Sequence, residues 1–313
     1  MNIRETTIVL ASRSPGVPRL ARWCLRYSPT QYGKKALAVV GDALERRTPH
    51  NVVATTQFGY EMFCETEDVI QRHIYLCGVW EPHLTAWIQG RLRPGDTFVD
   101  VGANVGYYTL LAASCVGQRG HVIAIEASPS IFGLLKNNVQ RNGIGTQVRS
   151  LNVAASDEAG TVTVYGGPKN NLGLTSTLPR EDFKIEATVQ SMPLRDILTD
   201  DEMTTARLIK IDVEGLEGPV VRGLLPALST CREDLELVLE VNGGPTPQGE
   251  KASDVVGLLR EFGFNVYEVT NSYRLDSYPE AVDRPQRPQR IYGEIDSDVS
   301  ADLIFSRIDA PHL

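Results

Sequence analysis

Three features are missing from this chain of 313 residues, and each absence excludes a class of protein. No apolar run approaches the roughly 20 residues that a transmembrane helix needs. The five cysteines are odd in number and include no close metal-binding pair, which is typical of reduced thiols in a cytoplasmic protein. An excess of positive charge is also missing, because the net charge is −8 and nucleic-acid binding usually needs a basic face. We therefore expect a cytoplasmic protein that binds no nucleic acid and has no transmembrane segment.

The glycine pattern of a dinucleotide site is missing as well. The apolar residues 98–101 precede a turn bracketed by Gly102 and Gly106, and a helical run follows, which is typical of a nucleotide-binding strand, turn and helix. A dinucleotide fingerprint would need glycines at the positions of Asn104 and Tyr107. A tyrosine there would obstruct close packing of the helix against the strand. The turn is therefore interpreted as a site for a nucleotide-like ligand other than NAD.

Two acids at the ends of apolar runs indicate which ligand binds. Asp100 would repel a pyrophosphate but would pair with an ammonium or sulfonium group, and S-adenosylmethionine carries both cations and no phosphate. Free N–H groups at the helix start would receive the carboxylate of that ligand. Glu126 stands where such folds place an acid that accepts both ribose hydroxyls. After it, Ser128 and Pro129 predict the start of a helix that runs to Arg141.

Three stretches resemble one family, the FkbM-type S-adenosylmethionine-dependent methyltransferases. They are Val-Asp-Val-Gly-Ala-Asn-Val-Gly at 99–106, Glu-Ala-Ser-Pro at 126–129 and Ile-Lys-Ile-Asp-Val-Glu-Gly-Leu-Glu at 209–217. The stretch ahead of the core also resembles the family's lead-in segment, at Tyr75, Gly78 and the Trp80-Glu81 pair. Glu81 is therefore expected to bind the cofactor. The resemblance covers roughly residues 58–270. It implies an O-methyltransferase acting on a hydroxyl of a sugar, glycolipid or polyketide-type metabolite, and it names no single substrate.

The alternation of apolar runs with helical segments predicts an α/β fold of the class I methyltransferase type, with helices on both faces of a Rossmann-like, mostly parallel sheet. Seven strands are expected, at residues 98–101, 121–126, 147–153, 208–212, 235–241, 265–269 and 303–306. The last two have no clear helix between them, which predicts an antiparallel edge. Upstream, residues 34–46 are expected to form a helix, and residues 52–56 and 60–64 a hairpin around Gly59. We expect an N-terminal accessory segment at residues 1–90 and a catalytic domain at residues 91–313.

Acids at the carboxyl ends of the strands are the candidates for catalysis, because ligands bind there in doubly wound sheets. Methyl transfer to a hydroxyl needs a group that removes its proton, and Asp212, Glu214 and Glu240 are candidates for that general base. Alternatively, Asp212, Glu240 and Asn242 would hold a divalent metal, for which oxygen ligands favour magnesium. Glu217 is expected to stabilise the start of the next helix instead.

Two expectations concern loops near these strand ends. Asp157 follows the third strand and either contacts the adenine amino group or caps the turn at 157–160. The polar stretch 166–180 contains Asn170 and Asn171, which would hydrogen-bond sugar hydroxyls if this loop binds the acceptor. An ordinary flexible loop would have a similar composition, so both interpretations stay open.

The expected partner is a small-molecule, glycan or glycolipid acceptor. Residues 19–26 are rich in arginine and would lie on a membrane surface as an amphipathic helix, or else form an exposed helix or tail. The sequence is compatible with a homo-oligomer and does not specify one. Two alternatives to a methyltransferase remain, namely a non-catalytic cofactor-binding protein of the same fold and a nicotinamide-dependent dehydrogenase.

Overall fold

The computed structural model describes residue 25 and residues 31–241, 251–296 and 300–313, so the basic helix expected at 19–26 lies almost entirely outside the described residues. The chain forms two compact units. The first combines the described residues up to Ala86 with Lys169–Asn171 and Asn271–Gln286, and the second combines Trp87–Pro168, Leu172–Thr270 and Arg287–Leu313. The boundary expected at residue 90 falls inside helix α5 (Pro82–Arg91). No helix within the described ranges is long and apolar enough to cross a bilayer.

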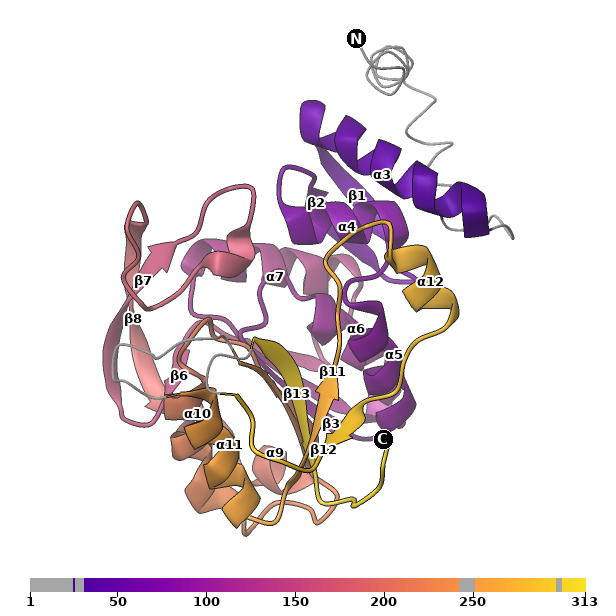
Figure 1. Cartoon of the computed structure of the whole chain (residues 1–313). Coiled ribbons are helices and arrows are strands. Elements are labelled where there is room, and N and C mark those ends of the chain that lie inside the picture. Colours follow the sequence, from indigo (N-terminus) through magenta and orange to yellow (C-terminus); the bar gives the residue numbers. More distant parts are fainter. Residues whose placement is uncertain (1–24, 26–30, 242–250, 297–299) are drawn as a thin grey trace. The chain divides into compact units, whose positions relative to one another are not determined.

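An eight-stranded sheet is the centre of the second unit (Figure 1). Its strands are β3 (Thr97–Val101), β4 (His121–Ile125), β5 (Val148–Leu151), β9 (Ala206–Ile211), β10 (Glu236–Val241), β11 (Asn265–Val269), β12 (Gln289–Ile291) and β13 (Ala301–Ser306). They lie in the order β12-β11-β13-β10-β9-β3-β4-β5. β4 and β5 lie on one side of β3, and β9 and β10 on the other, so the strand order reverses between β3 and β9. Ligands of doubly wound sheets bind beyond the carboxyl ends of the strands at such a reversal.

All seven expected strands are present, and the expected class I architecture is confirmed. β13 runs antiparallel to both of its neighbours, β10 and β11, and the short β12 adds an antiparallel strand at the edge. The expectation that no helix separates the last two predicted strands is wrong, because α12 (Tyr278–Asp283) lies between β11 and β13. A helix of six residues is too short to show the apolar periodicity by which a helix is recognised in a sequence.

Helices cover both faces of this sheet. The helical segments between residues 82 and 261 are α5, α6 (Tyr107–Val116), η1 (Gly117–Arg119), α7 (Pro129–Arg141), α8 (Leu194–Ile197), α9 (Asp200–Thr205), α10 (Glu217–Leu224), η3 (Leu225–Ala227) and α11 (Ala252–Glu261). On one face, Val99 and Ile209 pack in a buried cluster with Val220 of α10 and Val255 of α11. On the other face, α6 contacts β3 and β4. β3 and β9 are buried along their whole length, which explains why they form continuous apolar runs in the sequence. α7 begins at Pro129, and Ser128 caps it by accepting a hydrogen bond from the Ile131 N–H, as predicted.

A smaller sheet of three strands accompanies the large one. Its strands are β6 (Ala154–Ser156), β7 (Gly160–Gly166) and β8 (Lys184–Pro193), in the order β6-β8-β7. β7 and β8 form the long hairpin in Figure 1, and the connection between them contains η2 (Leu172–Leu174). This connection carries the polar stretch that the sequence suggested for acceptor binding.

The first unit contains α3 (Gln31–Arg47), the hairpin of β1 (Asn51–Thr55) and β2 (Glu61–Glu65), α4 (Val69–Cys77) and α12. The expected N-terminal helix and the hairpin are confirmed. α4 was not predicted, although Asp68 caps it by accepting from the Gln71 N–H and Gly78 ends it at φ 76°. α4 is nine residues long, and every residue from Gln71 to Cys77 is buried, including the polar Gln71, Arg72 and His73.

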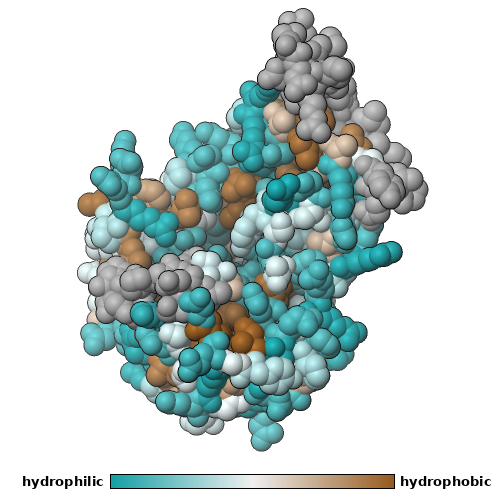
Figure 2. Space-filling model, viewed as in Figure 1, coloured by the Kyte–Doolittle hydropathy of each residue, from teal (hydrophilic) through white to brown (hydrophobic). Residues whose placement is uncertain are grey.

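Large hydrophobic side chains that reach the surface come from separate elements of both units. Figure 2 shows hydrophilic residues over most of the face in view, with hydrophobic residues in small separate groups. The large exposed hydrophobic residues are Val39, Val53, Ile185, Phe262, Tyr273, Tyr292 and Ile308.

Candidate active site

The glycine turn after β3 is shaped by close contacts with neighbouring segments. Gly102 has φ 80°, and a Cβ atom at this position would lie 1.7 Å from the carbonyl oxygen of Asp212. Gly106 has φ 93°, and its Cβ would lie 2.6 Å from Leu135 Cδ1. Both positions therefore require glycine, because a side chain would be strained and would also collide with a neighbour. At Gly102 the missing side chain lets the end of β9 approach the turn.

The backbone N–H groups of the turn are largely engaged by the protein itself. The Asn104 N–H donates to Glu126 Oε2 at 2.9 Å, and the Val105 N–H donates to Asn104 Oδ1 at 2.7 Å. The Gly106 N–H donates to the Ala103 carbonyl at 2.9 Å. These three N–H groups precede α6 and have partners within the protein, whereas the N–H groups expected to receive the ligand carboxylate are those at the start of the helix, from Tyr107 onward. The sequence could not show that these N–H groups have partners. One acceptor, Glu126, comes from the segment after β4, and Asn104 adopts an uncommon backbone conformation with φ 50°.

Glu126 follows β4 and joins that strand to the glycine turn. Besides the bond from Asn104, its Oε1 accepts a 2.8 Å hydrogen bond from the Ser128 N–H. Burial raises the pKa of Glu126 to about 7, and these two backbone hydrogen bonds lower it only in part. Each carboxylate oxygen has a second lone pair, so Glu126 retains the capacity to accept two further hydrogen bonds. This is the capacity that a ribose diol requires.

A second acid at the start of α7 was not singled out in the sequence. Glu186 of β8 accepts hydrogen bonds from Ser128 Oγ at 2.8 Å and from the Ser130 N–H at 2.9 Å. Helix N-termini attract anions, and a phosphate is a common ligand there. In this protein the carboxylates of Glu126 and Glu186 already occupy that position. This arrangement disfavours a phosphate at the start of α7.

Asp100 is buried at the end of β3 and is held by the start of α6. Thr109 Oγ1 donates to Asp100 Oδ2 at 2.6 Å. Burial raises the pKa of Asp100 to about 6, and the positive charge of Lys210 opposes this shift. Only 1% of Asp100 is exposed, so the structure places it behind the turn rather than at its surface.

Lys210 is a buried cation that sequence reasoning missed. It pairs with Asp100 in the register between β3 and β9, and its Nζ lies 2.7 Å from Asp212 Oδ2. The same ammonium lies over the ring of Tyr108, 4.8 Å from the centroid. The available signal was a lysine inside an otherwise apolar strand, because a buried lysine almost always needs a charged partner. Lys210 thus links the acids at the ends of two adjacent strands.

The turn that follows β9 carries Glu214 in a strained conformation. Its φ is 57°, which is uncommon for a residue other than glycine. Arg180 Nη2 lies 3.2 Å from Glu214 Oε2, and Ser176 Oγ donates to the Glu214 carbonyl at 3.0 Å. Burial and the nearby charge of Asp212 raise the pKa of Glu214 to about 7, although Arg180 opposes the shift. The connection between β7 and β8 therefore covers this turn.

Glu217 has the structural role expected of it. It is the first residue of α10, and its Oε1 accepts hydrogen bonds from the N–H groups of Gly215 at 3.1 Å and Val213 at 3.3 Å. These bonds close the turn before the helix. Burial raises the pKa of Glu217 to about 7.

The remaining candidates are placed in different parts of the chain. Asp157 forms an ion pair with Arg222 of α10 at 3.0 Å, an interaction that neither sequence interpretation included. Glu240 lies in β10 opposite Asp302 of β13. Glu81 belongs to the first unit, where it is buried, has φ 42° and accepts a hydrogen bond from Tyr273 Oη. Asn242 lies outside the described residues.

The described residues do not support the magnesium hypothesis. Across the described ranges, no three His, Cys, Asp or Glu side chains are grouped so that they could hold a metal ion. Asp212 faces the ammonium of Lys210, which would repel a cation at that carboxylate.

The comparisons with known proteins agree with this geometry. The methyltransferase FkbM domain matches residues 100–266, which is more than half of the chain. The 31-O-demethyl-FK506 methyltransferase FkbM of Streptomyces tacrolimicus is 30% identical over 205 residues, which cover 56% of this chain and 75% of that protein. A protein-L-isoaspartate O-methyltransferase of Caenorhabditis elegans is 28% identical, covering 49% of this chain and 63% of that protein. The hexuronic acid methyltransferase AglP of Haloferax volcanii is 26% identical, covering 53% of this chain and 62% of that protein. The predicted resemblance is confirmed, and the chain belongs to the FkbM family of S-adenosylmethionine-dependent methyltransferases.

Proposed function

We propose that this protein transfers a methyl group from S-adenosylmethionine to a hydroxyl of a sugar, glycolipid or polyketide-type metabolite. The observation that carries the proposal is a surplus of buried acid at the strand ends. The pKa of Asp100 is raised to about 6, and those of Glu126 and Glu214 to about 7, mainly by burial. A cationic ligand would supply the missing compensation, because an opposite charge nearby favours the ionised form of an acid.

The acceptor class is suggested by relatives as well as by the site. The names of the FK506 and hexuronic acid methyltransferases point to a hydroxyl of a metabolite and to an acidic sugar as acceptors of those two proteins. We take these two names as support for a small-molecule or sugar acceptor of the present chain.

Glu126 and the glycine turn are proposed to hold the donor. The free lone pairs of Glu126 would accept hydrogen bonds from the two ribose hydroxyls. Gly102 and Gly106 keep the backbone close to β9 and α7, so the ligand meets the backbone of the turn at this point. Asp100 acts from behind the turn through its charge and through its bond to Thr109, which fixes the start of α6.

Glu214 is proposed as the general base. When bound, the donor supplies the methyl group from its sulfonium, and the electron pair of the broken S–C bond stays on sulfur. The acceptor oxygen forms the new bond to carbon, and its proton passes to the Glu214 carboxylate. A base with a pKa near 7 both accepts and releases a proton readily at neutral pH. Asp212 is paired with Lys210, and we assign it to orienting the acceptor, while Glu240 stays a candidate for the general base.

Donor binding is tested first, by isothermal titration with S-adenosylmethionine, S-adenosylhomocysteine and NAD. We expect the two sulfur compounds to bind and NAD not to bind. Binding of NAD alone would refute the proposal and would favour the dehydrogenase.

The base is tested with Glu214→Gln, which keeps the shape of the side chain and removes its basicity. Methyl transfer from labelled donor to a panel of glycosides and hydroxylated polyketides should fall at least a hundredfold, with donor affinity nearly unchanged. The matched control is Glu181→Gln, an exposed acid next to Arg180, which should keep full activity. Donor binding without transfer to any acceptor in the wild-type protein would favour a non-catalytic binding protein.

A further inference from the structure

An aromatic cluster in the first unit has no part in the chemistry described above. Trp80 and Tyr273 are stacked, with ring centroids 5.4 Å apart and an interplanar angle of 21°. His73 contacts Trp80 edge-on at 5.5 Å and Tyr278 at 4.9 Å. Tyr273 is 50% exposed although Trp80 lies against its ring. A large aromatic side chain is therefore presented to solvent on a rigid aromatic base.

The orientation of the Tyr273 ring is fixed at both ends. Tyr273 Oη donates to Glu81 Oε1 at 3.1 Å, and the Tyr273 carbonyl lies 3.2 Å from His73 Nε2. Glu81 is buried and has φ 42°. Backbone strain of this kind persists only where the surroundings hold it, and it is concentrated at binding and catalytic sites. A surface tyrosine without a function would not need such support.

A chain of three hydrogen bonds connects the backbone of Asn170 with the backbone of Tyr273. The Val69 N–H donates to the Asn170 carbonyl at 3.0 Å, His73 Nδ1 lies 2.7 Å from the Val69 carbonyl, and His73 Nε2 reaches Tyr273. Val69 and His73 are one turn of α4 apart, about 6 Å along the helix axis. The tip at 169–171 is therefore connected to Tyr273 through α4 within the same unit, and Asn170 is exposed.

We propose that Tyr273, supported by Trp80, is a stacking platform for a hexopyranose ring, and that Asn170 hydrogen-bonds the hydroxyls of this ring. The face of an aromatic ring is electron-rich and attracts the weakly positive C–H groups of a pyranose. The amide of asparagine both donates and accepts hydrogen bonds, which matches a hydroxyl. The inference deepens the proposed function, on which it rests, by naming a sugar as the acceptor or as a part of it.

Saccharide binding to the full-length protein tests the platform. The probes are methyl β-glucopyranoside and methyl β-glucuronopyranoside, detected by saturation-transfer NMR and by tryptophan fluorescence, to which the stacked Trp80 contributes. We expect saturable binding that Tyr273→Ala weakens at least tenfold. Tyr273→Phe keeps the ring and loses the bond to Glu81, so it should retain most of the affinity. The control Tyr292→Ala removes another exposed tyrosine, which belongs to the second unit, and should change nothing.

Two results would overturn the inference, namely no saturable binding of either glycoside, or equal binding by wild type and Tyr273→Ala. If Tyr273→Ala does not fold, as judged by its circular dichroism melt, Asn170→Ala serves instead and should weaken binding severalfold. S-adenosylmethionine titrations on the same samples separate the two proposals. Donor binding without saccharide binding removes the platform alone, whereas saccharide binding without donor binding removes the proposed methyl transfer.

Discussion

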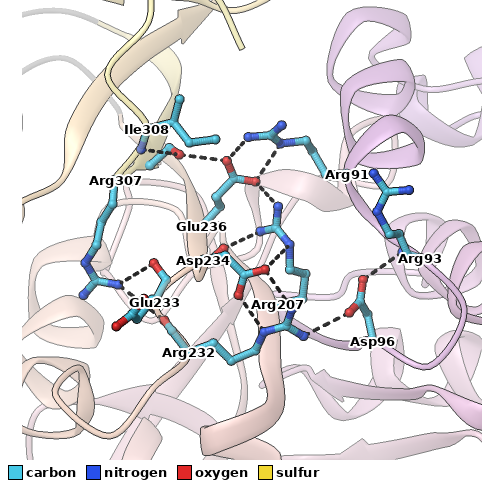
Figure 3. A network of polar contacts seen from close by, with 11 residues as sticks. Arg91, Arg93, Asp96, Arg207, Arg232, Glu233, Asp234, Glu236, Arg307 and Ile308 are labelled. Carbon is cyan, nitrogen blue, oxygen red and sulfur yellow. Dashed lines mark hydrogen bonds and ion pairs between the residues drawn. The ribbon is translucent and has the colours of Figure 1, made fainter.

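The two ends of the central sheet treat buried acids in opposite ways. At the amino ends, Glu236 meets two guanidinium groups, those of Arg91 and Arg207, and also accepts from Ser306 Oγ at 2.8 Å (Figure 3). At the carboxyl ends, the acids around the glycine turn have pKa values raised by burial. The same sheet therefore carries a compensated ionic network at its amino end and an undercompensated group of acids at its carboxyl end.

The network at the amino ends continues beyond Glu236. Arg232 lies 3.0 Å from Asp96 and 2.7 Å from Asp234, and its hydrogen bonds lower the pKa of Asp234. Arg207 also donates to the Asp234 carbonyl at 2.6 Å. These contacts of Arg232 and Arg207 connect the loops at the amino ends of the strands. At the amino ends the protein itself compensates the buried acids, whereas at the carboxyl ends the proposed function assigns part of the compensation to a bound ligand.

The largest expected effect comes from breaking the compensated end. Glu236→Ala leaves Arg91 and Arg207 near each other without their common partner, and loss of one member of a buried ion pair typically costs about 3–5 kcal/mol. Urea unfolding should show this loss of stability, with donor affinity of the folded protein unchanged. The control Glu233→Ala removes an exposed acid nearby and should change stability by about 0.5 kcal/mol or less. A loss of donor affinity in folded Glu236→Ala would contradict the contrast between the two ends.

The next effect concerns the turn itself. Gly102→Ala places a methyl group 1.7 Å from the Asp212 carbonyl at a positive φ, so we expect a loss of about 2–3 kcal/mol and of donor binding. Gly133→Ala is the matched control, because Gly133 lies within α7 and its Cβ would meet nothing within 4 Å. That change should stabilise the protein by about 0.5–1 kcal/mol. Equal effects of the two substitutions would show that the close approach of β9 to the turn is not needed.

The raised pKa of Glu126 predicts that both stability and donor affinity depend on pH. Because the pKa of Glu126 is raised, the folded protein binds more protons than the unfolded chain between about pH 4.5 and pH 7. The contribution of this group to the free energy of unfolding should therefore fall as the pH rises through that range. Donor affinity should change in the opposite direction and be about tenfold higher at pH 8 than at pH 6, because the cation favours the ionised acid.

Glu126→Gln tests the source of this pH dependence. Calorimetric titration at pH 6, 7 and 8 should show a weaker affinity whose change with pH is reduced. A wild-type affinity that is the same at all three pH values would be evidence against the surplus of acid as the basis of donor binding.

The smallest expected effect is at Asp157, whose pair with Arg222 is about one third exposed on both sides. Exposed ion pairs contribute up to about 1 kcal/mol, so Asp157→Asn should lower stability by no more than that. Donor affinity separates the remaining interpretations. If it falls severalfold while stability is kept, Asp157 contacts the adenine, and if it does not change, Asp157 only anchors α10.

The positions of the acids were predictable from the sequence, but their partners were not. Asp100, Glu126 and Asp212 end or follow apolar runs, and parallel strands bring their carboxyl ends to one edge of the sheet. The pairing of Asp212 with Lys210 and that of Glu186 with the start of α7 depend on the register of strands and on contacts between distant segments. Such contacts leave no periodic trace in a sequence.

The sequence by itself determined the strands, the glycine turn and the family. Buried strands require apolar residues, and Gly102 requires a residue without a side chain, so these constraints are written locally. Only the tertiary structure decided which acids are compensated, because burial and the distance to a cation set a pKa, and both arise from packing. The sequence assigned Glu126 to the ribose hydroxyls and left Asp157 between two roles, and packing then paired Asp157 with Arg222 and buried Glu126 at the glycine turn.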